Sequence, residues 1–231
     1  MLALFPEGFE EAERGDAVEL RAYTDAAGEH RAREDFGSVQ TASVPDDWER
    51  RWREFHRALE VGGLWVGPPW MDPPPGATAV TIDPGRAFGT GAHPTTRLCI
   101  ELLSALPRGS LLDAGCGSGV IAIAASLLGF APVIAIDVDP AAVAAARRNG
   151  AANGVELDVR QADVVVDSLP TADAVIANID ERRVAAVGQR VVSASLVTSG
   201  YFESHVPMLA GYRLLERRTE NGWAADLHAR E

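Results

Sequence analysis

The chain has 231 residues, a mass of 24.5 kDa and a formal net charge of −12, from 33 acidic residues and 21 basic residues that are all arginine. A hydrophobic fraction of 47% is typical of a globular protein and argues against a disordered or fibrous chain. Because binding to phosphates needs a basic face, we expect no direct nucleic-acid partner, and a basic partner fits the charge better.

Two cysteines, Cys99 and Cys116, are too few for a disulfide framework and suit a reducing compartment. The first residues are acidic and lack the basic and apolar segments of a signal peptide. The chain has no stretch of roughly 20 apolar residues that would indicate a membrane span. We therefore expect a cytoplasmic protein without membrane contact.

Residues 1–45 form an acidic segment with short structural elements. Alternating apolar and polar residues over 17–25 predict a half-buried strand, and residues 28–40 predict a turn that leads into a short helix. The segment is too small for an independent core, so we expect a small α+β appendage at the N-terminus.

An amphipathic helix is predicted over 46–59, where apolar side chains recur at helical spacing: Trp48, Trp52, Phe55 and Leu59. The arginines between them are interpreted as a solvated face, with an acidic ligand as the alternative: Arg50, Arg51, Arg53 and Arg57. Residues 61–77 are rich in glycine, proline and tryptophan and predict a connector with one short strand. The expected domain organisation is a truncated N-terminal segment at 1–45, a linker helix and connector at 46–76, and the main domain at 77–231.

From residue 110 onward, short apolar runs alternate with helical stretches. Strands are predicted over 111–114, 133–137, 156–161, 173–178 and 195–200, and helices over 120–128 and 141–149. Near-continuous apolar strands separated by helices are typical of a parallel sheet covered on both faces. The pair Asn221 and Gly222 predicts a closing hairpin. The expected fold is α/β: a doubly wound, mostly parallel, Rossmann-like sheet with a C-terminal antiparallel hairpin.

A glycine-rich turn follows the first of these strands. Gly115, Gly117 and Gly119 allow the backbone to turn sharply into a helix and to bring its N–H groups against a ligand. Asp137 ends the next strand, 22 residues after Gly115, where an acid can accept hydrogen bonds from ribose hydroxyls. The dinucleotide fingerprint G-x-G-x-x-G would need glycine at position 120, which is valine. The G-x-G-x-G pattern, preceded by Asp113, instead resembles Rossmann-like methyltransferases that use S-adenosylmethionine.

The stretch 82–103 is a strand end, a flexible loop and a helix start, and Pro94 suits the first helical turn. Thr95 and Thr96 can cap this helix or donate hydroxyls to a bound carboxylate, and both roles stay open. His93 is either a base or, in the interpretation that we favour, the residue that holds its own loop together. Three connector side chains can wall an entrance, although simple packing is the commoner role: Trp65, Trp70 and Met71.

Six motifs together resemble the PrmA family, the methyltransferases of ribosomal protein L11. In chain order they are "DWERRWREFH", "LWVGPPW", "IDPGRAFGTGAHPTTRLC", "LLDAGCGSGVIAIAASLLG", "IAIDVDPAAVAAARRNGAANGV" and "DAVIANI". They cover residues 47–179 closely, and the tail matches loosely. The resemblance implies an S-adenosylmethionine-dependent protein methyltransferase that acts on lysine side chains or the N-terminal amine of ribosomal protein L11.

The same resemblance implies which residues bind the cofactor. Carried over by motif, Thr96 meets the methionine end, Gly115 lies along the cofactor, Asp137 binds ribose and Asn178 faces the transferred methyl group. Gly117 shares the close approach of the backbone. Asp163 either reaches the adenine amine or is a solvated loop acid. No side chain is assigned as catalytic or as a metal ligand.

The chain departs from the family pattern in three places. The N-terminal substrate-recognition region is short, the run "DERRV" at 180–184 replaces apolar and small residues, and the stretch 178–199 is shortened. These departures leave two alternatives beside the L11 methyltransferase: a related methyltransferase with another acceptor, and an inactive cofactor-binding module.

Overall fold

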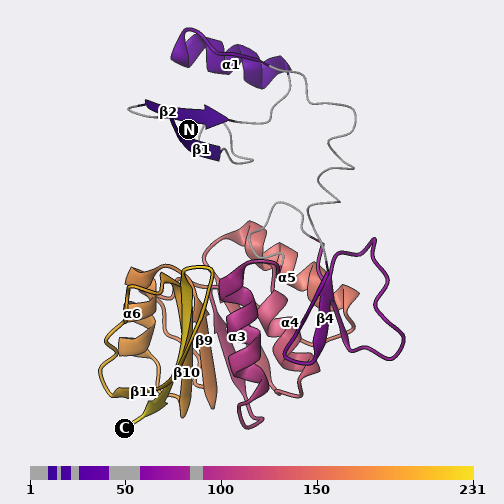
Figure 1. The fold of residues 1–231 in the computed structure, drawn as a ribbon, viewed down its shortest axis with the longest axis vertical. Coiled ribbons are helices and arrows are strands. Elements are labelled where there is room, and N and C mark those ends of the chain that lie inside the picture. Colours follow the sequence, from indigo (N-terminus) through magenta and orange to yellow (C-terminus); the bar gives the residue numbers. More distant parts are fainter. Residues whose placement is uncertain (1–9, 15–16, 22–25, 42–57, 84–90) are drawn as a thin grey trace. The chain divides into compact units, whose positions relative to one another are not determined.

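The computed structural model describes residues 10–14, 17–21, 26–41, 58–83 and 91–231 (Figure 1). The chain divides into two compact units, residues 1–52 and residues 53–231. Most of the helix expected over 46–59 lies outside the described residues, and the domain bounds 1–45, 46–76 and 77–231 stay a prediction. In the part of the chain that is described, none of the helices has the length and apolar character of a membrane span.

The first unit contains a strand pair and one helix. Strands β1 (Glu10–Arg14) and β2 (Ala17–Arg21) are antiparallel, with Glu10 opposite Arg21, and helix α1 (Ala26–Phe36) follows. An i,i+4 ion pair between Arg33 and Glu29, at 2.9 Å, supports the helix, and Gly37 ends it with a φ of 77°. The α+β character expected for this segment is therefore present, although β1 was not predicted.

The second unit is built on a seven-stranded sheet in the order β11-β12-β10-β9-β6-β7-β8. Five parallel strands form its main part: β6 (Leu111–Ala114), β7 (Val133–Asp137), β8 (Asp158–Gln161), β9 (Ala174–Asn178) and β10 (Ser195–Phe202). The antiparallel strands β11 (Tyr212–Glu220) and β12 (Trp223–Arg230) close one edge around the turn at Asn221 and Gly222. The expected α/β fold with a C-terminal antiparallel hairpin is confirmed.

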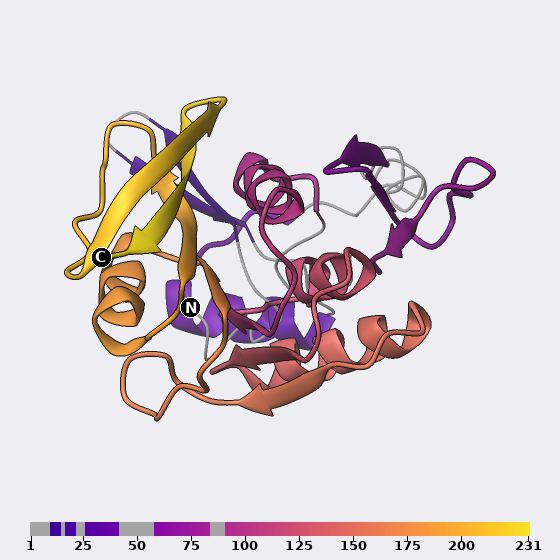
Figure 2. The ribbon, with the colours of Figure 1, turned by 90° about the horizontal axis from the view of Figure 1, so that it is seen from below.

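Helices cover both faces of this sheet because successive strand residues point to opposite sides. Leu111 packs into a core with helices α3 (Pro94–Ser104), α4 (Val120–Leu127) and α5 (Pro140–Ala152). Leu112 packs into a second core with helix α6 (Glu181–Arg190). Figure 2 shows α3 and α4 on one side of the sheet and α6 on the other.

A small three-stranded sheet precedes the main one. Strand β3 (Leu59–Val61) is antiparallel to β4 (Leu64–Gly67), and β4 is parallel to β5 (Ala79–Thr81). One strand, β4, lies within the connector at 61–77, as predicted, whereas the prediction of helix as far as Leu59 was wrong because Leu59 begins β3. Gly62 and Gly63 have φ values of 57° and 81°, which allow a tight turn that pairs Leu59 with Val66.

Candidate functional site

The glycine turn after β6 is the first part of the site. Gly115, Gly117 and Gly119 have φ values of 90°, 53° and 83°, a region that glycine adopts without steric cost. The N–H groups of Gly115 and Cys116 both donate to the carbonyl of Ile136 near the end of β7, at 2.8 and 2.9 Å. The turn is therefore anchored to the neighbouring strand, and α4 starts directly after it.

Ile179 lies between two glycines and fixes the segment after β9. A Cβ atom on Gly115 would lie 2.3 Å from Cγ2 of Ile179, and one on Gly200 would lie 1.9 Å from the Ile179 carbonyl oxygen. The Ile179 N–H also donates to the carbonyl of Ser199 on β10, at 3.2 Å. Because neither glycine can carry a side chain here, Ile179 holds its neighbours Asn178 and Asp180 beside the glycine turn.

A cavity of about 450 Å³ opens at the carboxyl ends of the parallel strands, where ligands bind in open α/β sheets. It is lined by residues from the glycine turn, from the carboxyl ends of β7, β8, β9 and β10 with the segments that follow them, and from the starts of α3, α6 and β12. These residues are His93, Thr95, Gly115, Gly117, Asp137, Val138, Ala162, Asp163, Val164, Asn178, Ile179, Asp180, Arg183, Gly200 and Trp223. The structure therefore brings four predicted residues, Gly115, Gly117, Asp137 and Asn178, into one cavity.

The Asp137 carboxylate is held in place by two backbone groups. One oxygen accepts the Gly117 N–H at 2.9 Å and the other accepts the Asp139 N–H at 3.0 Å. A carboxylate has about four acceptor positions, so these bonds orient Asp137 and leave acceptor capacity toward the cavity. This geometry suits a ligand that presents hydroxyl groups at the end of β7.

Thr96 lies behind the cavity and supports Asn178. Thr96 is 2% exposed on α3, and its hydroxyl is 3.5 Å from the side-chain nitrogen of Asn178. Its neighbour Thr95 lines the cavity, whereas Thr96 does not. Asp163 lines the cavity and also accepts the N–H of Val165 at 2.8 Å, so its loop role and its ligand role both stay open.

His93 caps helix α3. Its Nδ1 atom accepts the N–H of Thr95 at 3.4 Å and lies 2.8 Å from the Thr95 hydroxyl oxygen. Burial, and then the charge of Arg97, lowers the pKa of His93 below its usual value. Its ring meets that of Trp223 edge to face at 4.8 Å. These contacts fit the residue that holds its own loop together rather than a base.

Asp113 at the head of the glycine turn is buried. One carboxylate oxygen accepts the Ala122 N–H in α4 at 3.1 Å, and the other has no hydrogen-bond partner among the described residues. Burial raises the pKa of this carboxyl to about 7; the bond to Ala122 opposes the rise and the charge of Asp137 adds to it. Burial also raises the pKa of the Cys116 thiol, which keeps it protonated and fits a small packing residue rather than a nucleophile.

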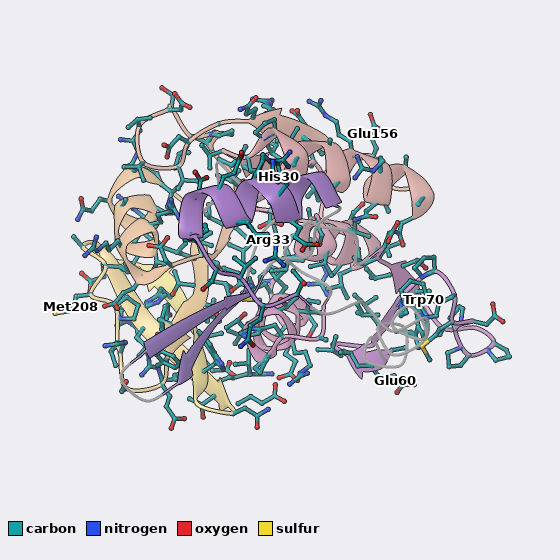
Figure 3. The ribbon with its side chains drawn as sticks, turned by 90° about the horizontal axis from the view of Figure 1, so that it is seen from above. His30, Arg33, Glu60, Trp70, Glu156 and Met208 are labelled. Atoms are coloured by element: carbon teal, nitrogen blue, oxygen red, sulfur yellow. The ribbon has the colours of Figure 1, made fainter. Side chains whose placement is uncertain are left out.

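Sequence reasoning missed several residues of the site. Trp223 was placed only in a closing strand, and Phe202 stacks on its ring at a centroid distance of 4.6 Å. Helix α6 was not predicted, although its buried Val184 and Val187 have helical spacing. The three connector residues considered for an entrance wall, Trp65, Trp70 and Met71, are not among those that line the cavity. Figure 3 shows Trp70 beside the small sheet.

Groups of three or more histidine, cysteine, aspartate or glutamate side chains that could hold a metal ion are not found in the described parts of the chain. The site is therefore a cavity with carboxylates, backbone amides, one amide side chain and an aromatic wall. Such a surface can bind and orient a polar organic ligand.

Comparison with known proteins identifies the family. A family model described as "Ribosomal protein L11 methyltransferase (PrmA)" matches residues 9–225. A relative from Symbiobacterium thermophilum named ribosomal protein L11 methyltransferase is 48% identical over 139 residues, which cover 58% of this chain and 46% of the relative. One of the same name from Aeromonas hydrophila is 40% identical over 192 residues, which cover 76% of this chain and 64% of the relative.

A solved structure shares the fold. The crystal structure of ribosomal protein L11 methylase from Lactobacillus delbrueckii subsp. bulgaricus superposes with a TM-score of 0.68 at 23% identity, and covers 76% of this chain and 100% of that one. The matched region spans about half to two thirds of the two curated relatives. Because the family model matches most of the chain, the protein belongs to the ribosomal protein L11 methyltransferase (PrmA) family.

Proposed function

We propose that this chain binds S-adenosylmethionine in the cavity and transfers its methyl group to amine nitrogens of ribosomal protein L11, on lysine side chains or the N-terminus. The observation that carries the proposal is the convergence of the glycine turn, Asp137 and Asn178 on one cavity, in a chain of the PrmA family. The names of the relatives support the acceptor.

The cavity fits the proposed cofactor in size and charge. Its volume of about 450 Å³ is within the usual range of roughly 300 to 1,000 Å³ for small-molecule sites. Asp137, Asp163 and Asp180 line it against one arginine, Arg183, which favours a ligand with cationic groups. S-adenosylmethionine has both a sulfonium and an ammonium group.

Each predicted residue has a role that its position allows. The backbone of Gly115 and Gly117 permits close approach of the cofactor, because no Cβ atom fills the space. Asp137 accepts hydrogen bonds from the ribose hydroxyls. Thr96 supports the methionine end through Asn178, and Asn178 lies beside the transferred methyl group. The partly buried contact between Thr96 and Asn178 makes these last two roles interdependent.

When bound, S-adenosylmethionine supplies a methyl group on a positively charged sulfur, which an uncharged amine can displace directly. The chain itself contributes positioning, because Asn178, Ile179 and Trp223 shape the cavity where the two reactants meet. The apolar surfaces of Ile179 and Trp223 also exclude water, and desolvation lowers the pKa of an entering amine. No dedicated base is required, and the Nδ1 atom of His93 is already occupied in capping α3.

The test is the intact mass of unmodified ribosomal protein L11 after incubation with the protein and S-adenosylmethionine. We expect the mass to rise in methyl-sized steps with the wild-type protein and to stay constant with an Asp137→Ala variant. Calorimetry on the same samples measures cofactor binding. Binding without a mass gain would refute this acceptor and favour another acceptor or an inactive module, and absence of binding would refute the whole proposal.

A further inference from the structure

Asp180 is a charged side chain at the cavity that the proposed reaction does not yet use. It lies two residues beyond Asn178 and lines the same cavity. Its position is fixed, because the preceding Ile179 is held between Gly115 and Gly200. Asp180 is also the N-cap of α6 and accepts the backbone N–H of Arg183 at 3.2 Å. A rigid backbone therefore presents this carboxylate beside the residue that we place at the transferred methyl group.

Arg183 is an ion-pair partner of Asp180 that another cation can replace. Its second oxygen lies 2.7 Å from the guanidinium of Arg183, and the two side chains are 49% and 56% exposed. By contrast, both oxygens of Asp137 accept backbone N–H groups, those of Gly117 and Asp139, and Asp163 accepts that of Val165. A half-exposed arginine side chain can rotate away at little cost, since such pairs contribute roughly 1 kcal/mol or less. An incoming cation can therefore replace it at Asp180.

We propose that Asp180 binds the positively charged end of the acceptor amine at the cavity, and that Arg183 competes with the acceptor for this carboxylate. The inference rests on the proposed function, because it assigns the acceptor side of the same site. Asp180 is a specificity-determining residue in this scheme: it selects a cationic acceptor over a neutral one of the same shape.

The scheme has a consequence for the pH dependence of the reaction. A carboxylate close to an ammonium raises the pKa of that ammonium, whereas attack on the methyl group needs the uncharged amine. The proton leaves to solvent, to which the half-exposed Asp180 is open. The other titratable or charged side chains that line the cavity are His93, Asp137, Asp163 and Arg183, and they are unchanged when only Asp180 is replaced.

Three variants separate charge from structure. Asp180→Asn keeps an N-cap residue of nearly equal quality and removes only the charge. Arg183→Gln removes the competitor. Glu181→Gln is the matched control, because the Glu181 carboxylate lies 3.7 Å from His205 and is not among the residues that line the cavity.

With ribosomal protein L11 as acceptor, we expect Asp180→Asn to raise KM for the acceptor about five-fold, the effect of one half-exposed ion pair. The acid limb of its kcat profile should move to lower pH. Arg183→Gln should lower this KM, and Glu181→Gln should change neither quantity. Cofactor affinity should stay the same in Glu181→Gln, and in Asp180→Asn and Arg183→Gln it should change less than KM for the acceptor. An unchanged KM and pH profile for Asp180→Asn would overturn the proposal.

A binding experiment keeps the inference separate from the identity of the acceptor. The probe is N-acetyl-lysine amide, titrated by NMR into the protein with S-adenosylhomocysteine, with uncharged N-acetyl-norleucine amide as the matched ligand. We expect the lysine probe to bind more tightly, and Asp180→Asn to remove the difference. Equal binding of the two probes to the wild-type protein would overturn the inference even if L11 is methylated. A difference that depends on Asp180, without methylation of L11, would support the inference while the proposed acceptor fails.

Discussion

Replacing Asp113 by asparagine should flatten the pH dependence of the free energy of unfolding between about pH 4 and pH 7. Asp113 is 1% exposed, and burial raises its pKa from 3.8 to about 7 in the folded protein. Asparagine has the same shape and keeps an oxygen that can accept the Ala122 N–H, but it does not ionise. The variant therefore removes the titration of Asp113 and little else.

The magnitude follows from the two pKa values. Between them the unfolded chain has lost the Asp113 proton and the folded protein still holds it, so stability falls as pH rises. The contribution of Asp113 to the free energy of unfolding is fully present below its pKa in the unfolded chain. It is lost once the pH exceeds its pKa in the folded protein. Each pH unit costs about 1.4 kcal/mol, so the roughly three units of this window cost about 4 kcal/mol in all.

The assay is urea unfolding of the wild-type protein and of the Asp113→Asn variant at several pH values from 4 to 8. Other groups titrate in this range, so the informative quantity is the difference between the two proteins at each pH. We expect the wild type to lose stability relative to the variant by about 4 kcal/mol from the acid to the neutral end. A difference that does not change with pH would refute a buried, neutral Asp113.

Three further predictions concern the cavity. Asp137→Ala should abolish S-adenosylmethionine binding measured by calorimetry, because it removes the carboxylate that Gly117 and Asp139 orient, and unchanged affinity would contradict the ribose assignment. Asn178→Ala should lower kcat by more than it lowers cofactor affinity, and equal losses would count against a place at the methyl group. His93→Asn should keep the α3 cap and change kcat by less than about three-fold, since asparagine is a good N-cap residue. A much larger loss of kcat at unchanged cofactor affinity would show that His93 takes part in proton transfer.

The main sheet was predictable because its strands carry strong local signals. The bounds expected for β6 and β7 are those observed, since each is a short apolar run ended by a glycine or an acid. Helix α6 was missed because the run after Asn178 was considered only as a departure from the family pattern. Half of its ten residues are polar or charged, and the buried stripe of Val184, Val187 and Gly188 becomes evident only against the sheet.

The part of the candidate site that lies at the carboxyl ends of the strands could be predicted from the sequence. Gly115, Asp137 and Asn178 each stand at the carboxyl end of a predicted parallel strand, so the topology alone brings them to one edge. The position of Thr96 does not follow from strand ends, because its contact with Asn178 joins residues 82 positions apart. Local patterns do not encode such a contact. The resemblance to the family supplied Thr96 as a candidate site residue, and the structure supplied its contact with Asn178.

The remaining residues of the site depend on register, which no local pattern determines. Gly200 reads as an ordinary glycine near a strand end, yet β10 pairs Ser199 with Asn178, and this places Gly200 against the Ile179 carbonyl. Trp223 reaches the cavity because β12 pairs it with Phe202 at the end of β10. A shift of one residue in the pairing of β12 would turn the Trp223 side chain to the other face of the sheet, and the same shift in β10 would move Gly200 away from Ile179. The part of the cavity formed by Gly200 and Trp223 is therefore a product of strand pairing. Ile179, which is fixed by two glycines 85 positions apart, connects this part to the glycine turn.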